Sequence, residues 1–172
     1  MALTYTPIAT NTLGSSTGSV TFSSIPQTYT DLILVISGKA ASATYDITAM
    51  YVNSITSNYS RTYLQGDGAS ALSGRATAEI RLRAGYLPGT NYASEYSADT
   101  YHFMNYANTT TYKTVLCRCN SVDTASQGFN VWTQVSLIPT TSAISSITIQ
   151  TANGANLYTG STFTLYGIAA SA

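Results

Sequence analysis

The stretch GSTFTLYGIAASA, residues 160–172, alternates large apolar and polar side chains, and this alternation decides the fold class. Successive side chains of a β-strand point to opposite faces, so Phe163, Leu165 and Gly167 share one face of an extended segment. We expect this strand, which closes the chain, to pair inside the chain's own sheet, in a small β-sandwich made for an assembly. The opposite face carries its other four residues: Thr162, Thr164, Tyr166 and Ile168.

The same alternation recurs upstream between turn residues. DLILVISG (31–38) is continuously apolar and predicts an interior strand covered on both faces. ATAEIRLRAG (76–85) predicts one amphipathic strand, with Ile80 and Leu82 inward and the charged residues outward. About ten such short strands, without a run at helical spacing, predict an all-β protein. We expect a single antiparallel β-sandwich domain over residues 1–172, with a jelly roll as the first choice of topology.

Charge is scarce in this sequence. Only 8% of residues are charged, against about 25% in an average soluble protein, and seven basic residues balance seven acidic ones. Without a basic patch to neutralise phosphates, nucleic-acid binding is disfavoured. Zero net charge promotes association, so the surface is either occupied by neighbours or kept soluble by its hydroxyl groups alone. Composition does not decide between these two alternatives.

Signals for export or membrane insertion are not visible. MALTYTPIAT (1–10) lacks a positive start followed by an apolar core. The longest strictly apolar run, LILVI (32–36), is far shorter than the roughly 20 residues that span a bilayer. Cys117 and Cys119 share one face of a predicted strand, about 6.5–7 Å apart, which is at or past the usual limit for a disulfide. We therefore expect two buried thiols and synthesis in a reducing host cytoplasm.

The residues available for catalysis are few. His102 is the only histidine, and no G-x-S-x-G motif accompanies it. A carboxylate pair for glycoside hydrolysis is conceivable, but Glu79 alternates with Arg81 and Arg83 and is interpreted as part of a charge ladder across strands. We expect no enzyme activity, no metal and no cofactor. The carboxylates considered are Glu79, Glu95, Asp99 and Asp123.

Four tyrosines gather around the stretch GYLPGTNYASEYSADTY, residues 85–101. Exposed aromatic rings serve sugar stacking and protein contacts equally well, and we favour a protein interface over a sugar site. The loop between Pro88 and Asp99 is the expected contact region. The candidate residues are Tyr86, Tyr92, Tyr96 and Tyr101.

Three stretches carry a resemblance to small structural proteins of tailed bacteriophages of the cyanophage and aquatic-phage type. They are SVTFSSIPQTYTDLILVISG (19–38), NSITSNYSRTYLQGDGAS (53–70) and TSAISSITIQTANGANLYTGSTFTLYGIAA (141–170). The last is the most specific, because its Gly-Ser-x-Phe-x-Leu-Tyr-Gly-Ile ending is shared by these phage proteins. Residues 72–136 match less clearly. The resemblance implies a β-sandwich virion component without catalytic residues.

Within that family two roles remain open. The resemblance fits a capsid decoration or cement protein, and the alternative is a tail or fibre component that binds a carbohydrate or receptor. A lone sandwich has no room for an adaptor, shaft and tip, which favours the head. The expected partners are further copies of the chain, most simply as a trimer, and other virion proteins, above all the major capsid protein. We expect location in the virion, without nucleic-acid or membrane binding.

Overall fold

The computed structural model describes residues 4–92, 95–121 and 130–169. Within these residues the chain forms twelve β-strands and no helix. Short segments rich in β-branched and aromatic residues, separated by turns, account for this pattern. In chain order the strands are β1 (Tyr5–Thr12), β2 (Val20–Phe22), β3 (Asp31–Ser37), β4 (Tyr45–Val52), β5 (Tyr59–Gly66), β6 (Ala71–Glu79), β7 (Leu82–Pro88), β8 (Asp99–Met104), β9 (Lys113–Ser121), β10 (Asn130–Ile138), β11 (Ile147–Thr151) and β12 (Thr162–Ile168).

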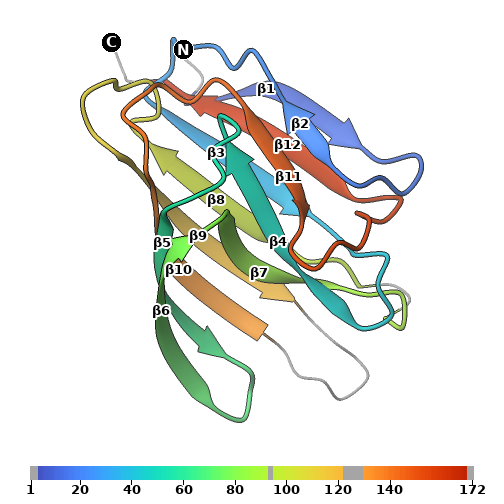
Figure 1. The fold of residues 1–172 in the computed structure, drawn as a ribbon. Helices are drawn as coiled ribbons and strands as arrows, with labels where there is room; N and C mark the ends of the chain where they lie inside the picture. The colour runs from blue at the N-terminus through green and yellow to red at the C-terminus, as the bar shows by residue number, and fades with distance from the viewer. Residues whose placement is uncertain (1–3, 93–94, 122–129, 170–172) are drawn as a thin grey trace.

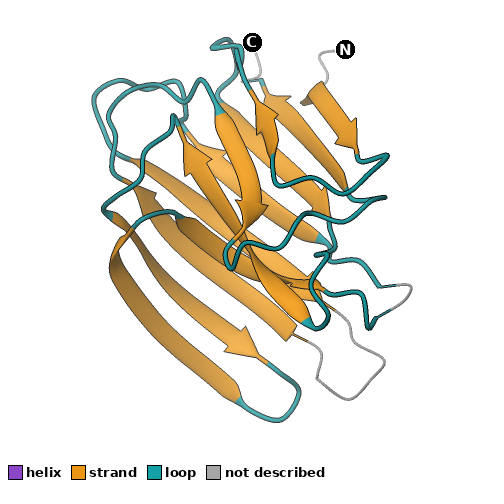
Figure 2. Cartoon of the chain, turned by 45° about the vertical axis from the view of Figure 1, so that its right-hand side comes forward, coloured by secondary structure: helices purple, strands orange, loops and turns teal. Residues whose placement is uncertain are grey.

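The strands form two antiparallel sheets that pack face to face (Figures 1 and 2). The large sheet has eight strands in the order β1-β12-β3-β8-β9-β10-β5-β6, and the small sheet has four in the order β2-β11-β4-β7. The predicted all-β sandwich is confirmed. The jelly-roll topology is not confirmed, and the sheets are unequal in size, so the large sheet extends beyond the small one.

The closing strand β12 lies inside the large sheet, as its alternation predicts. It pairs with β1 on one side and with β3 on the other. Phe163 and Leu165 are fully buried in the core. Gly167 faces the same way, and a Cβ there would come within 2.3 Å of the Tyr29 ring. A side chain at position 167 would therefore displace Tyr29 from the core.

Strand β3 is interior in the sheet but is not covered equally on both faces. Leu32, Leu34 and Ile36 are fully buried in the core between the sheets. Val35 projects from the opposite face and is exposed. Ile33 on that same face is buried, so the expectation that this strand is covered on both faces holds at Ile33 and fails at Val35.

Residues 76–85 are not one strand, which corrects a second expectation. The chain leaves the large sheet at the end of β6, bends at Ile80 and Arg81, and enters the small sheet as β7. Ala78 has a positive φ of 55° just before this crossing. Ile80, expected inside, is 53% exposed, whereas Leu82 is buried as expected. Because the apolar–polar alternation continues through the bend, the sequence pattern does not reveal that the chain changes sheet there.

The small sheet does not reach the far edge of the large sheet. Its edge strand β7 packs on β9, on β10 and to a lesser extent on β5, and the β5–β6 hairpin projects beyond it (Figure 1). We call the face of the large sheet toward the small sheet its inner face. One row of paired residues crosses that face: Leu165, Leu34, Tyr101, Cys117, Gln134, Tyr63 and Gly74.

Candidate functional site

The four predicted tyrosines do not form a common surface. Tyr101 on β8 is fully buried and its hydroxyl donates to the Ala84 carbonyl oxygen at 2.9 Å. Tyr92 is also buried. Tyr96 is half-buried and donates from its hydroxyl to the Thr159 carbonyl oxygen at 3.0 Å. Tyr92 and Tyr101 are therefore unavailable to a partner or sugar, because the core encloses both rings.

Tyr86 lies instead in an aromatic cluster at the open edge of the sandwich. Its ring meets the Trp132 ring edge-on at 5.8 Å and the Tyr45 ring at 4.9 Å. Tyr63 stacks on Trp132, with ring centroids 4.4 Å apart and planes 17° apart. These four residues come from β7, β10, β4 and β5. We call them, together with Arg61, the aromatic ledge.

The position of Tyr86 depends on a β-bulge in β7. The pairing between β4 and β7 shifts between Ile47 and Ala49, so two residues of β7 oppose one of β4. Gly85 at this bulge has a φ of +75°, and a Cβ there would meet the Cys119 Cβ at 2.6 Å. Bulges re-aim neighbouring side chains. Here the bulge lets the edge strand approach β9 closely and places Tyr86 over the edge toward Trp132.

Polar side chains hold the aromatic ledge in place. The Trp132 indole Nε1 donates to Gln134 Oε1 at 2.9 Å, and Gln134 Nε2 donates to the Arg83 carbonyl oxygen at 2.8 Å. β7 is an edge strand, so its carbonyl groups have no strand partner on one side, and a buried unpaired carbonyl is costly. Gln134 satisfies one of them while fixing the indole ring. This explains why β10 buries an amide and exposes valines.

Arg61 adds a cation to the aromatic ledge. Its guanidinium carbon lies 5.2 Å from the Tyr63 ring centroid and 5.8 Å from that of Trp132. Arg61 Nε lies 3.0 Å from Glu79 Oε2. The sequence predicts a charge ladder of Glu79 with Arg81 and Arg83. In the structure Glu79 of β6 pairs instead with Arg61 of β5. The pair leaves the aromatic ledge nearly neutral.

The hydroxyl of Tyr86 stays protonated at neutral pH. Burial raises the pKa of Tyr86, the nearby Tyr45 raises it further, and a hydrogen bond with the Gln65 side chain lowers it. Tyr86 and Gln65 therefore offer a neutral donor and acceptor set beside the rings. Neutral groups of this kind orient an uncharged ligand rather than attack it chemically.

The remaining candidates for catalysis lie apart from one another. His102 Nε2 is 2.9 Å from Asp31 Oδ2 on the outer face. Asp99 is fully buried, where burial raises its pKa to about 8 despite bonds from the Ser97 hydroxyl and the Asn120 amide. Asp123 lies outside the described residues. Among the residues that the structure describes, no cluster of three or more metal-ligating side chains occurs.

Asp99 faces the two cysteines, which are free and buried as predicted. Burial first, and Asp99 second, raise the pKa of Cys117, and the same two causes raise that of Cys119. Both thiols stay protonated at neutral pH, and a thiol rather than a thiolate is a poor nucleophile. This cluster is therefore part of the core.

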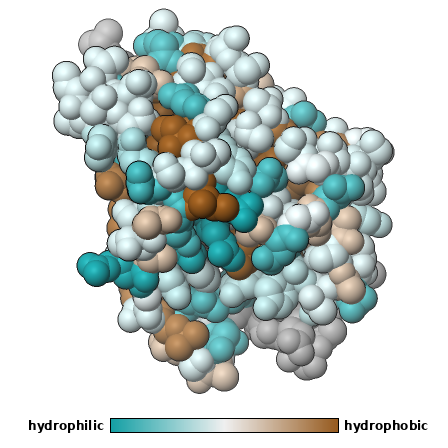
Figure 3. All heavy atoms as spheres, viewed as in Figure 1, coloured by the Kyte–Doolittle hydropathy of each residue, from teal (hydrophilic) through white to brown (hydrophobic). Residues whose placement is uncertain are grey.

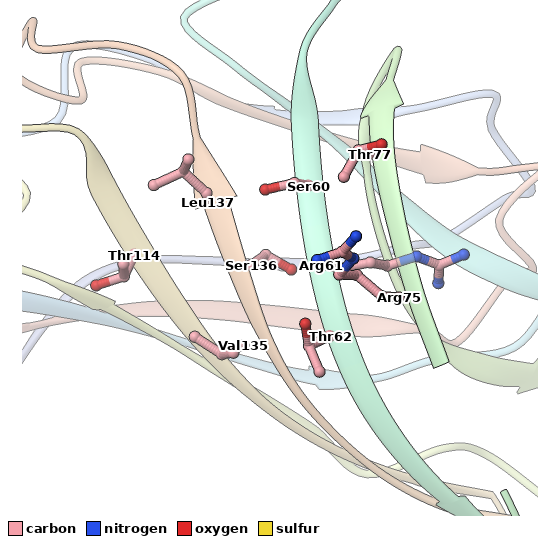
Figure 4. A pocket seen from close by; sticks show the side chains of 9 residues that line it. All are labelled: Ser60, Arg61, Thr62, Arg75, Thr77, Thr114, Val135, Ser136 and Leu137. Atoms are coloured by element: carbon pink, nitrogen blue, oxygen red, sulfur yellow. The ribbon is translucent and has the colours of Figure 1, made fainter. Parts of the chain in front are cut away.

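A second surface is the outer face of the large sheet. Val131 and Leu64 are 64% and 59% exposed there, and Val135 is 48% exposed. A trough of about 250 Å³ crosses four strands beside them. Figure 4 shows that it is lined mainly by small hydroxyl and aliphatic side chains from β9, β10, β5 and β6, with Arg61 and Arg75 close together on one side. We call the following residues the outer patch: Thr62, Leu64, Val131, Thr133 and Val135.

The side of the molecule with the small sheet in front differs from the outer patch in the hydropathy of its surface. Figure 3 shows it as mostly pale, with strongly hydrophilic residues scattered over it, several of them near its middle. Within the described part of the chain no helix is long and apolar enough to cross a membrane.

No family model matches this sequence, and no curated protein is similar enough to count as a relative. The functional argument therefore rests on the residues. Sequence reasoning missed Tyr45, Tyr63, Trp132 and Arg61, since they lie on strands that only the sheet order brings together. The one available signal was the single tryptophan in the chain, placed on a strand whose other face carries valines.

Proposed function

We propose that the protein is a non-enzymatic structural component of a tailed-phage virion, acting as a decoration or cement protein on the head shell. The observation that carries this proposal is the outer patch. Its residues are uncharged and exposed, and they lie on adjacent interior strands of a wide sheet. The resemblance of the three sequence stretches to phage structural proteins supports the same role.

The outer patch is suited to contact with a protein neighbour. Two rows of paired residues cross this face, and their basic and acidic side chains are limited to Arg75, Arg118 and His102. Threonine and valine lose little side-chain entropy when buried. Contiguous exposed apolar residues of this kind mark interaction sites on soluble proteins. A neighbouring protein can therefore cover this face without burying many unpaired charges.

The proposed neighbours are further copies of the chain and the major capsid protein. Zero net charge imposes little long-range repulsion between copies. Shell lattices offer three-fold positions, which favour a trimer. The outer patch would then supply the contact that seats each copy on the shell or against its neighbour.

Quantitative mass spectrometry of purified virions tests the location. We expect hundreds of copies per particle, as a protein that covers a shell lattice requires. A few copies per particle would contradict the decoration role and place the protein in the tail or a fibre.

A variant pair tests the outer patch itself. The double substitution Val131→Lys and Val135→Lys should make the protein monomeric and prevent binding to shells, because it places two charges in the proposed contact. Thr21→Lys on β2 adds a charge at an exposed position of the small sheet and should leave assembly unchanged. Multi-angle light scattering and shell co-sedimentation measure both. Unchanged assembly of the double variant would reject this surface.

A further inference from the structure

We infer that the aromatic ledge is a binding site for the pyranose rings of a neutral glycan. This inference is independent of the proposed virion role and of a position on head or tail. It rests on the overhang of the large sheet, the ring geometry and the polar groups beside the rings, whose two opposite charges are paired.

The floor of the site is the inner face of β6. This edge strand carries Leu72, Gly74 and Ala76 on the face that pairs with Gln65, Tyr63 and Arg61 of β5. Leu72 is 52% exposed, which shows that the small sheet does not cover this end. A Cβ on Gly74 would come within 2.6 Å of the Tyr63 ring. The absence of a side chain there lets the Tyr63 ring lie across the strand.

The rings form a corner at this floor. Tyr63 is nearly parallel to Trp132, and Tyr86 stands at 73° to Trp132. Tyr45 stands at 80° to Tyr86 and is 48% exposed. Trp132 is buried and supports the others. A sugar ring has C–H groups on its face and hydroxyls at its rim, so a corner of aromatic faces and polar edges matches its shape.

The polar groups beside the corner match sugar hydroxyls. Arg61 provides N–H donors, Glu79 provides acceptor oxygens, and Gln65 provides both. Because Arg61 and Glu79 are paired at 3.0 Å, the site has little excess charge for a phosphate backbone. Single-stranded nucleic acid also stacks on aromatic rings, but it needs a positive groove. The near-neutral pair favours a glycan.

The test uses Trp132 fluorescence, since the chain has a single tryptophan and it lies in the site. We expect neutral oligosaccharides selected on a glycan array to shift its emission, with little dependence on salt. Tyr45→Ala should weaken this binding about tenfold, as expected for loss of an aromatic contact. Tyr63→Phe should keep it, because the ring remains.

Tyr5→Ala is the matched control. Tyr5 is equally exposed, and its ring meets Tyr166 edge-on at 6.4 Å, but it lies at the opposite edge of the large sheet. The Tyr5→Ala variant should bind the glycan with the same affinity as the unaltered protein. Absence of any glycan binding at millimolar concentrations, equal weakening by Tyr5→Ala, or salt-dependent binding of oligothymidylate instead would each overturn the inference.

Discussion

The two halves of the large sheet use their inner faces differently. In the half covered by the small sheet, Leu165 and Leu34 are fully buried among aliphatic side chains. In the overhanging half, the same row continues through Tyr63 and Gly74. What changes along the row is burial: Leu165, Leu34, Tyr101, Cys117 and Gln134 are all buried, whereas Tyr63, one strand further on, is only half-buried. Where one side of a residue faces water, an amphipathic ring can be packed on one face and wetted on the other.

The largest effect should come from the covered half. Deleting residues 160–172 removes β12 and unpairs both β1 and β3, so we expect loss of folding, measured by circular dichroism and gel filtration. Truncation after residue 169 keeps every described strand and should fold. A folded but merely monomeric deletion variant would show that β12 serves an interface instead.

Two leucines compare the halves directly. Leu34→Ala leaves a cavity in the covered core and should lower the free energy of unfolding by about 2–5 kcal/mol. Leu72→Ala, in the overhang, removes an exposed side chain and should change it by no more than about 0.5 kcal/mol. Urea denaturation measures both. Similar losses would mean that the overhang is packed as a second core.

The covered half contains a buried carboxyl group, Asp99, which should make the stability of the protein depend on pH. Asp99, in the covered half, has a pKa of about 8 in the folded protein and an ordinary value near 4 when unfolded. Between these values the folded state keeps a proton that the unfolded state has lost, so stability should fall as pH rises through this window.

The loss should approach about 1.4 kcal/mol per pH unit. Asp99→Asn should flatten that slope and be the more stable form at pH 8. The free energy of unfolding measured in urea at several pH values gives the slope. A stability that rises from pH 5 to pH 8 would contradict the buried carboxyl.

The smallest effect should be the coupling of Arg61 and Glu79 in the overhang. A double-mutant cycle with Arg61→Ala and Glu79→Ala should give about 1 kcal/mol, because the pair is close but partly wetted. A coupling of several kcal/mol would show that this edge is as dry as the covered half.

The sequence predicts what is local and misses what depends on sheet order. Alternation correctly assigns the faces of Phe163, Leu165 and Cys117, because successive side chains take opposite faces wherever the strand lies. It fails at Ile80, since a bend that moves the chain to another sheet leaves the alternation intact. It also fails for Tyr63 and Trp132, because their stacking requires β10 to pair with β5. No pattern within one strand contains that pairing.

The pairing of β12 between β1 and β3 also determines how long β3 lacks one of its partner strands during synthesis. Tyr5 pairs opposite Ile168, so the sheet joins the two ends of the described chain, and such distant contacts make folding slow. On a ribosome that adds 5–20 residues per second, β3 waits on the order of ten seconds for residues 162–168. During that time its apolar run LILVI has an unpaired edge. We therefore expect ribosome-associated chaperones to bind the nascent chain during this interval.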